Sequence, residues 1–265
     1  MNSAFVGIVL LCGASGLLRG QASPDPAIEA ARNYARDYAR SLPDYVVTRD
    51  TSRFRGVRPL LKGTPGNWQL TDTISAELTV RNGVESYANL RRNGKPISAL
   101  PGGVWSTGEF AAELMTVLAP ERNAKFKAER TESLRKRQVK RYRFSVDQKH
   151  SNWVLNAKNI PGSHDLPAFA CAYEGAIWMD IQTAKILRVQ MAAKDLPLGG
   201  PLDGVSSQTD YDFTDIDGTQ YVLPAHTEAV SCEKRTGVCF RNSSDFHGYK
   251  KFQVNSQMVF DNGRP

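Results

Sequence analysis

The segment from Glu174 to Met191 has the pattern of a β-hairpin and constrains the fold more than any other stretch of the sequence. In its second half, Leu187, Val189 and Met191 alternate with less apolar neighbours, the two-residue period of a strand with one buried face. A short polar turn from Asp180 to Ala184 connects this half to an apolar first half. We therefore expect two antiparallel strands here.

Other segments carry the same kind of signal. Residues Ile74 to Val80 alternate strictly, and Asn82-Gly83 after them is the preferred pair for a type I′ hairpin turn. Asn93-Gly94 repeats this turn signal. Four strands are expected near the end of the chain, at Val205–Phe213, Tyr221–Cys232, Val238–Phe246 and Tyr249–Phe260. Because no internal repeat or low-complexity linker divides the chain, we expect one domain over residues 23–265.

Two helices are expected among these strands. Asp25-Pro26 has the N-cap and first-turn proline of a helix that ends before Pro43. Ser106 to Glu109 reads as a capping box, in which the serine accepts a backbone hydrogen bond and the glutamate reaches back. Pro120 follows the end of this second helix.

The second helix carries the candidate ligand-binding residues. Its apolar stripe is either part of the core or the inner face of a lid over an apolar cavity, with a glycine-containing approach at residues 102–105. The candidates are Trp105, Phe110, Leu114, Val117 and Leu118.

A basic segment follows between Arg135 and Val146. From Arg141 onward its residues alternate, so one face is apolar and the other is basic. We expect residues Trp153 to Leu155 to form the partner strand. The basic face either is simply solvated or attracts an anionic surface of the cell envelope.

The N-terminus predicts export. An apolar run from Phe5 to Leu18 ends at small residues, which indicates a signal peptide over residues 1–22 cleaved between Ala22 and Ser23. The alternatives are an N-terminal membrane anchor and, less favoured, a lipoprotein modified at Cys12. After cleavage no transmembrane segment is expected, and the protein would lie in the periplasm or outside the cell. The net charge of +7 would then reflect surface solubility or attraction to anionic polymers rather than nucleic-acid binding.

Cysteine usage agrees with an oxidising compartment. Cys232 and Cys239 flank a hairpin loop from Lys234 to Gly237, a register that sets the two cysteines opposite each other and favours a disulfide. Cys171 has no partner nearby in the sequence and is expected to be a buried small hydrophobic residue. The cysteine spacing matches no zinc-binding pattern.

A search for catalytic chemistry returns little. Ser163, His164 and Asp165 are adjacent in the chain, whereas the members of a catalytic triad converge from separate segments. His226 and His247 could meet across neighbouring strands, with Asp245 or Glu228 nearby, as a metal site. Isolated histidines on strands are more often ordinary surface or core residues. We therefore expect no cofactor and no enzymatic activity, and a hydrolase is the third-ranked alternative.

The order of these elements resembles the LolA/LolB/RseB-like superfamily of bacterial envelope proteins. Smaller motifs, including Asn93-Gly94-Lys95-Pro96 and Asp217-Gly218, are similar to uncharacterised exported proteins of Acidobacteria. The resemblance implies an α+β fold, a strongly curved antiparallel half-barrel of about ten or eleven strands with two helices over its concave face. It also implies binding of an apolar ligand, either a lipid or a lipoprotein acyl chain. The alternative is an interaction or sensor module whose core is filled by its own side chains.

Overall fold

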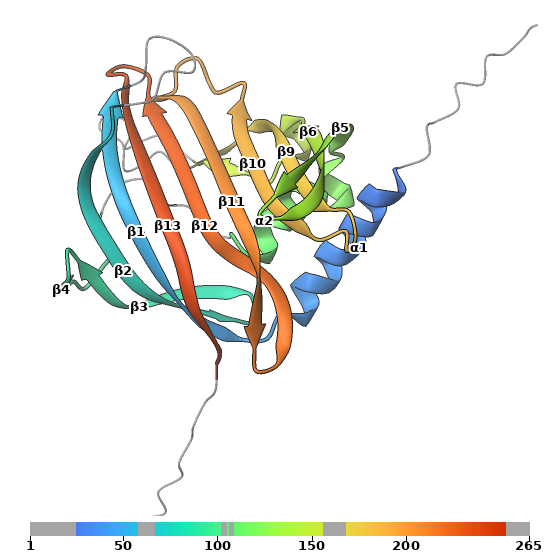
Figure 1. Cartoon of the computed structure of the whole chain (residues 1–265). Coiled ribbons are helices and arrows are strands. Elements are labelled where there is room, and N and C mark those ends of the chain that lie inside the picture. Colours follow the sequence, from blue (N-terminus) through green and yellow to red (C-terminus); the bar gives the residue numbers. More distant parts are fainter. Residues whose placement is uncertain (1–24, 58–66, 102–104, 106–108, 156–167, 253–265) are drawn as a thin grey trace, which may run out of the picture.

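The computed structural model describes residues 25–57, 67–101, 105, 109–155 and 168–252 (Figure 1). Within these residues the helices are α1 (Pro26–Ser41) and α2 (Ala111–Leu118), and short 3₁₀ turns lie at Pro120–Arg122 and Gln148–His150. The strands are β1 (Tyr45–Val57), β2 (Gln69–Arg81), β3 (Val84–Arg92), β4 (Lys95–Pro96), β5 (Lys125–Leu134), β6 (Arg137–Val146), β7 (Val154–Leu155), β8 (Phe169–Ala170), β9 (Ala172–Asp180), β10 (Ile186–Lys194), β11 (Leu202–Ile216), β12 (Thr219–Glu233) and β13 (Val238–Lys251).

One large antiparallel sheet dominates the fold. Its strand order is β4-β3-β2-β1-β13-β12-β11-β10-β9-β6-β5, and β7 and β8 form a separate pair. The sheet bends strongly and does not close on itself, and α2 lies inside the bend (Figure 1). This arrangement confirms the predicted α+β class with a curved sheet of eleven strands and two helices.

The two helices complete the core. α1 begins as predicted, with the Asp25 carboxylate accepting a hydrogen bond from the backbone nitrogen of Ala27. It buries Ile28, Ala31, Ala35 and Tyr38, which recur at helical spacing, and it packs against α2. The apolar side chains of β6, β9 and β10 close the core from the sheet side.

The hairpin formed by β9 and β10 confirms the prediction from residues 174–191. Its turn is held by Asp180, whose Oδ1 accepts hydrogen bonds from the backbone nitrogens of Gln182 and Thr183. Gly175 is required at its position because a Cβ there would lie 1.8 Å from the carbonyl oxygen of Gln190.

Both Asn-Gly turns are also confirmed. Asn82 and Gly83 have φ angles of 50° and 74°, and Asn93 and Gly94 have 49° and 79°. Two successive positive φ angles define the type I′ geometry, whose twist matches that of the strands it joins.

The predicted partner of the basic segment is wrong. β6 pairs with β5 and β9, whereas Val154 and Leu155 pair with β8. β5 is an edge strand with no buried residue, so its sequence lacks an apolar alternation that could reveal it. The β5–β6 turn is formed by Arg135 and Lys136, which take φ angles of 48° and 66° without an Asn-Gly signal.

The predicted break between the last two strands is wrong, because β13 runs without interruption from Val238 to Lys251. β13 continues through Gly248, where its register with β1 shifts between Val46 and Thr48. Gly248 has a φ of +69°, so a bulge accommodates the glycine that lies between the two predicted strands. Val254, Met258 and Phe260 of the predicted final strand lie outside the described residues.

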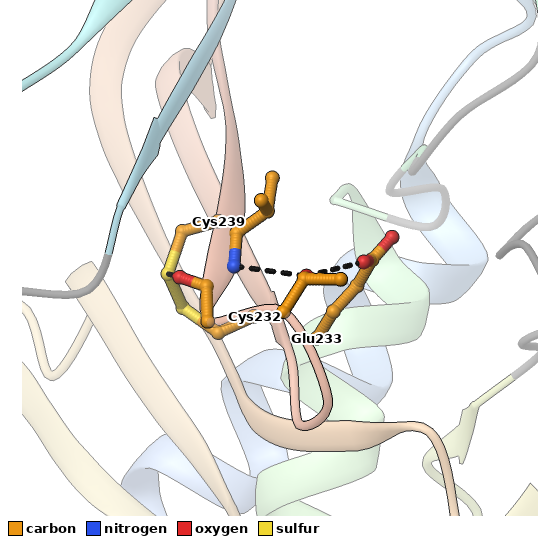
Figure 2. Close-up of a disulfide and its surroundings, with 6 residues drawn as sticks. Cys232, Glu233 and Cys239 are labelled. Carbon is orange, nitrogen blue, oxygen red and sulfur yellow. Dashed lines mark hydrogen bonds between the residues drawn. A yellow bond between two sulfur atoms is a disulfide. The ribbon is translucent and has the colours of Figure 1, made fainter.

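The disulfide between Cys232 and Cys239 is confirmed (Figure 2). The two residues are direct partners in the β12–β13 register, and the loop between them includes Gly237 with a φ of +66°. Thr236 stabilises the loop by donating to the Glu233 carboxylate and accepting from the backbone nitrogen of Val238. Cys171 is buried, as expected, and the structure shows it as a free cysteine.

No helix in the described part of the chain is long and apolar enough to cross a membrane. The predicted signal peptide and its cleavage site between Ala22 and Ser23 lie outside the described residues.

Candidate ligand-binding cavity

A cavity of about 710 Å³ lies between α2 and the concave face of the sheet. One side is formed by α2 and the residues before it, the opposite side by strands β10, β11 and β12, and a third side by residues 152–155. Its apolar lining comprises Trp105, Ala112, Met115, Trp153, Val154, Leu155, Met191, Leu202, Val205, Ala229 and Val230. Its polar lining comprises Glu109, Glu113, Thr116, Asn152, Ser206, Ser207, Thr209, Thr227 and Ser231.

Of the five side chains selected from the sequence, Trp105 lines this cavity. The structure places the other four, Phe110, Leu114, Val117 and Leu118, in the packed core, with exposed fractions of 4% or less. They are not part of the cavity lining. Their direct contact with a ligand stays a prediction, whereas their packing in the core is observed.

The predicted capping box does not start α2. The helix begins at Ala111 with Phe110 as its N-cap, and no side chain caps it, while Ser106 lies outside the described residues. Glu109 is instead used for an ion pair with Arg49, because that buried guanidinium needs a carboxylate partner. The later start places Ala112 and Met115 toward the cavity.

The ion pair between Arg49 and Glu109 fixes the approach to α2. Nη2 of Arg49 lies 3.2 Å from Oε1 of Glu109, and the two side chains are only 2% and 3% exposed. Arg49 also donates to the hydroxyls of Tyr87 and Ser244. Such shared hydrogen bonding is what makes a buried charge tolerable.

A second acid, Glu113, is held at the cavity wall by Tyr211. The phenol oxygen of Tyr211 lies 2.8 Å from Oε2 of Glu113 and 2.8 Å from the backbone oxygen of Glu109. The phenol has one proton to donate, and either of these two oxygens can accept it. Burial raises the pKa of Glu113 to about 8, although hydrogen bonds from Thr209 and Tyr211 lower it in part. Glu113 is therefore largely a neutral carboxylic acid at pH 7.

Trp105 has one polar contact at an edge of its ring and a cation over its face. Its indole nitrogen donates to the backbone oxygen of Pro101 at 2.8 Å, and the Arg53 guanidinium lies 5.2 Å from its ring centre. Arg53 is itself paired with the buried carboxylate of Asp72 at 3.3 Å. The tryptophan thus presents a positioned apolar surface to the cavity.

Sequence reasoning missed the polar part of the cavity. Ser207 and Thr209 of β11 lie beside Thr227 and Ser231 of β12 on one face of the sheet, and we call these four residues the hydroxyl wall. Thr209 and Thr227 are hydrogen-bonded through their hydroxyls at 3.2 Å. The sequence did contain a signal for this wall. Serine and threonine recur with a two-residue period in β11 and β12, where apolar residues were expected on the concave face.

The two histidines considered for a metal site form separate pairs. His226 Nδ1 lies 2.7 Å from Asp245, and His247 Nε2 lies 2.8 Å from Asp50. Among the described residues no group of three or more His, Cys, Asp and Glu side chains could hold a metal ion.

The basic face of β6 is engaged with acidic neighbours. Arg141 and Arg143 both pair with Glu129 of β5, and Arg141 also lies 5.1 Å from the ring centre of Trp178. Each of the two guanidinium groups is thus paired with a carboxylate next to it. Attraction of an anionic surface to this face stays a prediction.

No protein-family model matches the chain, and the comparison with curated proteins finds no match. Among solved structures the chain is similar to a LolA superfamily protein from Nitrosomonas europaea, at 9% identity and a TM-score of 0.34 over 86% of this chain and 93% of the other. A DUF1329 family protein from Desulfovibrio piger matches at 14% identity and a TM-score of 0.39, over 88% of this chain and 96% of the other. The lipoprotein LppX from Mycobacterium tuberculosis matches at 10% identity and a TM-score of 0.28, over 88% and 99%.

The resemblance to LolA-like proteins that the sequence suggested is thus also found among solved structures. Because each of these TM-scores lies below 0.5, we derive the function from the residues of this chain alone.

Proposed function

We propose that this protein is a non-catalytic, exported binding protein that holds a lipid or an acyl chain in the cavity between α2 and the concave sheet. The observation that carries the proposal is the cavity itself. Its volume of about 710 Å³ lies within the range of roughly 300–1,000 Å³ usual for small-molecule sites.

The apolar part of the lining supports an apolar ligand. Trp105, Met115, Trp153 and Met191 come from four separate segments and converge on this one space. The free energy falls when an apolar ligand replaces water against apolar side chains that line a cavity. Methionine and tryptophan also adapt well to flexible chains because they are large and polarisable.

Export is supported by the disulfide between Cys232 and Cys239, since structural disulfides persist mainly in oxidising compartments. A non-catalytic role is supported by the positions of His226 and His247, whose imidazoles pair with carboxylates and take no part in the cavity lining.

The second candidate is an interaction or sensor module with a self-filled core. The packing of Phe110, Leu114, Val117 and Leu118 in the core favours it, because this half of the concave face is already occupied. The two functions differ in whether the remaining cavity takes up a ligand.

A cavity-filling variant separates them. In Ala229→Phe the new ring projects into the cavity, whereas Ala192→Phe places the same ring on an exposed position of β10. Titration with the neutral fluorescent probe N-phenylnaphthylamine should give saturable binding to wild type and Ala192→Phe. Binding to Ala229→Phe should be about tenfold weaker or absent, because the ring takes the space of the probe.

Melting curves on the three proteins establish that each is folded. Wild-type protein that shows no saturable binding would favour the sensor module. Equal affinity of Ala229→Phe and wild type would place the probe elsewhere and reject the cavity as the site.

A further inference from the structure

The cavity has two chemically different walls. The apolar side chains converge from α2, residues 152–155 and β10, while the hydroxyl wall of Ser207, Thr209, Thr227 and Ser231 lies on the neighbouring strands β11 and β12. Thr209 is opposite Thr227, whereas Ser207 is opposite Ala229 and Ser231 is opposite Val205, so the four hydroxyl residues share one face of the two strands and only the threonines are directly opposed. A purely aliphatic ligand would leave this wall facing hydrocarbon.

The hydroxyl wall contains an unsatisfied group. Ser207 Oγ is buried and has no hydrogen-bond partner among the described residues. A buried hydroxyl without a partner is unfavourable, and rotation of the Ser207 side chain, which lines the cavity, would bring it to a polar group of a ligand. Thr116, on the facing helix, donates its own proton to the backbone oxygen of Ala112 and keeps lone pairs that can accept from a ligand.

The charges around the cavity restrict what that polar group can be. The described lining includes two acidic residues, Glu109 and Glu113, and no lysine, arginine or histidine. Arg49 binds Glu109 but is not part of the lining, so its charge is already engaged. An anionic group placed here would be desolvated beside the carboxyl groups of Glu109 and Glu113, and no cationic side chain of the described lining would face it.

Resting on the proposed lipid-binding function, we propose that the ligand is a neutral amphiphile with a hydroxyl-bearing polar group. The polar group lies against the hydroxyl wall and hydrogen-bonds to Ser207, while the acyl chain packs on Trp105, Met115 and Met191. The site discriminates against the same chain carrying a carboxylate or phosphate. Glu113, as a neutral acid bound to Tyr211, contributes a hydrogen-bonding group without adding a second negative charge.

The test compares two competitors that share one acyl chain. Monoolein and oleate are used at pH 7, below the concentrations at which they self-assemble, to displace N-phenylnaphthylamine from the wild-type protein. Monoolein should displace the probe at a concentration about tenfold lower than oleate, because only oleate brings a charge into the cavity. Equal or stronger displacement by oleate would overturn the proposal.

A charge placed in the hydroxyl wall should reverse the preference. Ser207→Lys introduces a cation into the lining, and Ser243→Lys adds the same charge on β13 at a position outside the lining. We expect Ser207→Lys to bind oleate about tenfold better relative to monoolein, while Ser243→Lys keeps the wild-type order. The same reversal in both variants would show attraction to net charge alone and would contradict the inference.

The outcomes separate this inference from the function on which it rests. If the wild type does not bind the neutral probe, the lipid-binding function fails and the inference fails with it. If the probe binds and oleate competes as well as monoolein, only the inference fails. If Ser207→Lys does not fold, the comparison of the two competitors on wild-type protein decides alone.

Discussion

The two faces of α2 meet different surroundings, although they belong to one short helix. One face, with Leu114 and Val117, is packed into the apolar core and is almost inaccessible to solvent. The other, with Ala112, Glu113 and Met115, borders a cavity whose far wall is partly polar. The core face determines where the helix sits, and the cavity face is free to serve a ligand.

This difference teaches that an apolar helix stripe does not by itself identify a binding surface. The most apolar residues of α2 are those that the core needs, since burying them stabilises the fold most. The residues left for a ligand are the mixed ones beside the stripe.

Glu109→Gln should have the largest effect, because it breaks the buried ion pair that fixes the chain before α2. We expect the free energy of unfolding to fall by roughly 3–5 kcal/mol, since Arg49 is left as a buried charge without its carboxylate. Denaturant unfolding measures the loss. The double variant Arg49→Met with Glu109→Leu is the control and should recover much of it, and a loss below about 1 kcal/mol in the single variant would contradict the account.

Leu114→Ala should cost stability without changing ligand affinity. Removing a side chain that is 1% exposed leaves a hole in the core, and the free energy of unfolding should fall by roughly 2–5 kcal/mol. Binding of N-phenylnaphthylamine, measured below the melting transition, should keep the wild-type affinity. A small loss of stability combined with weaker binding would move this face of the helix to the ligand site.

Glu113→Gln should remove a dependence of stability on pH. Burial raises the pKa of Glu113 from its ordinary 4.5 to about 8, so the folded state holds the proton more tightly than the unfolded state. This contribution is fully present below pH 4.5 and is lost as the pH rises toward 8.

Between pH 5 and pH 8 the free energy of unfolding of the wild type should therefore fall by roughly 2–4 kcal/mol more than that of Glu113→Gln. Unfolding midpoints across this range measure the effect. Parallel pH profiles of the two proteins would show that Glu113 is ionised in the folded state.

Met115→Ala should have the smallest effect on stability and a clear effect on binding. The side chain is partly exposed and borders the cavity, so its loss leaves no closed hole, and we expect less than about 1.5 kcal/mol. Affinity for N-phenylnaphthylamine should fall because an apolar contact is lost. Met115→Ala should thus lose affinity and little stability, whereas Leu114→Ala should lose stability and no affinity. Equal stability losses in the two variants would contradict the difference between the two faces of α2.

The sequence predicted the features that depend on nearby residues. The two Asn-Gly turns, the β9–β10 hairpin and the Cys232–Cys239 disulfide each follow from a short segment. Local backbone preference and a two-residue period suffice for them. The edge strand β5 escaped because it buries nothing and its turn is formed by Arg135 and Lys136.

The site could not be predicted in the same way because its contacts join distant segments. Arg49 meets Glu109 across 60 positions, and Glu113 meets Tyr211 across 98. Neither pair leaves a local pattern in the sequence. The helix stripe was recognisable, but only the curvature of the sheet decides which of its sides faces the core and which faces the cavity.

The central claim is that a ligand enters beside α2 and leaves the core unchanged, and three methionines can report on it. Met115 and Met191 line the cavity, Met191 from within the core cluster, whereas Met179 packs in the core and is not part of the lining. Methyl NMR spectra of protein carrying ¹³C-methyl methionine, recorded during a titration with monoolein, follow all three at once. The account predicts saturable shifts of the Met115 and Met191 signals and an unchanged Met179 signal. Shifts at Met179 with none at Met115 and Met191 would contradict it.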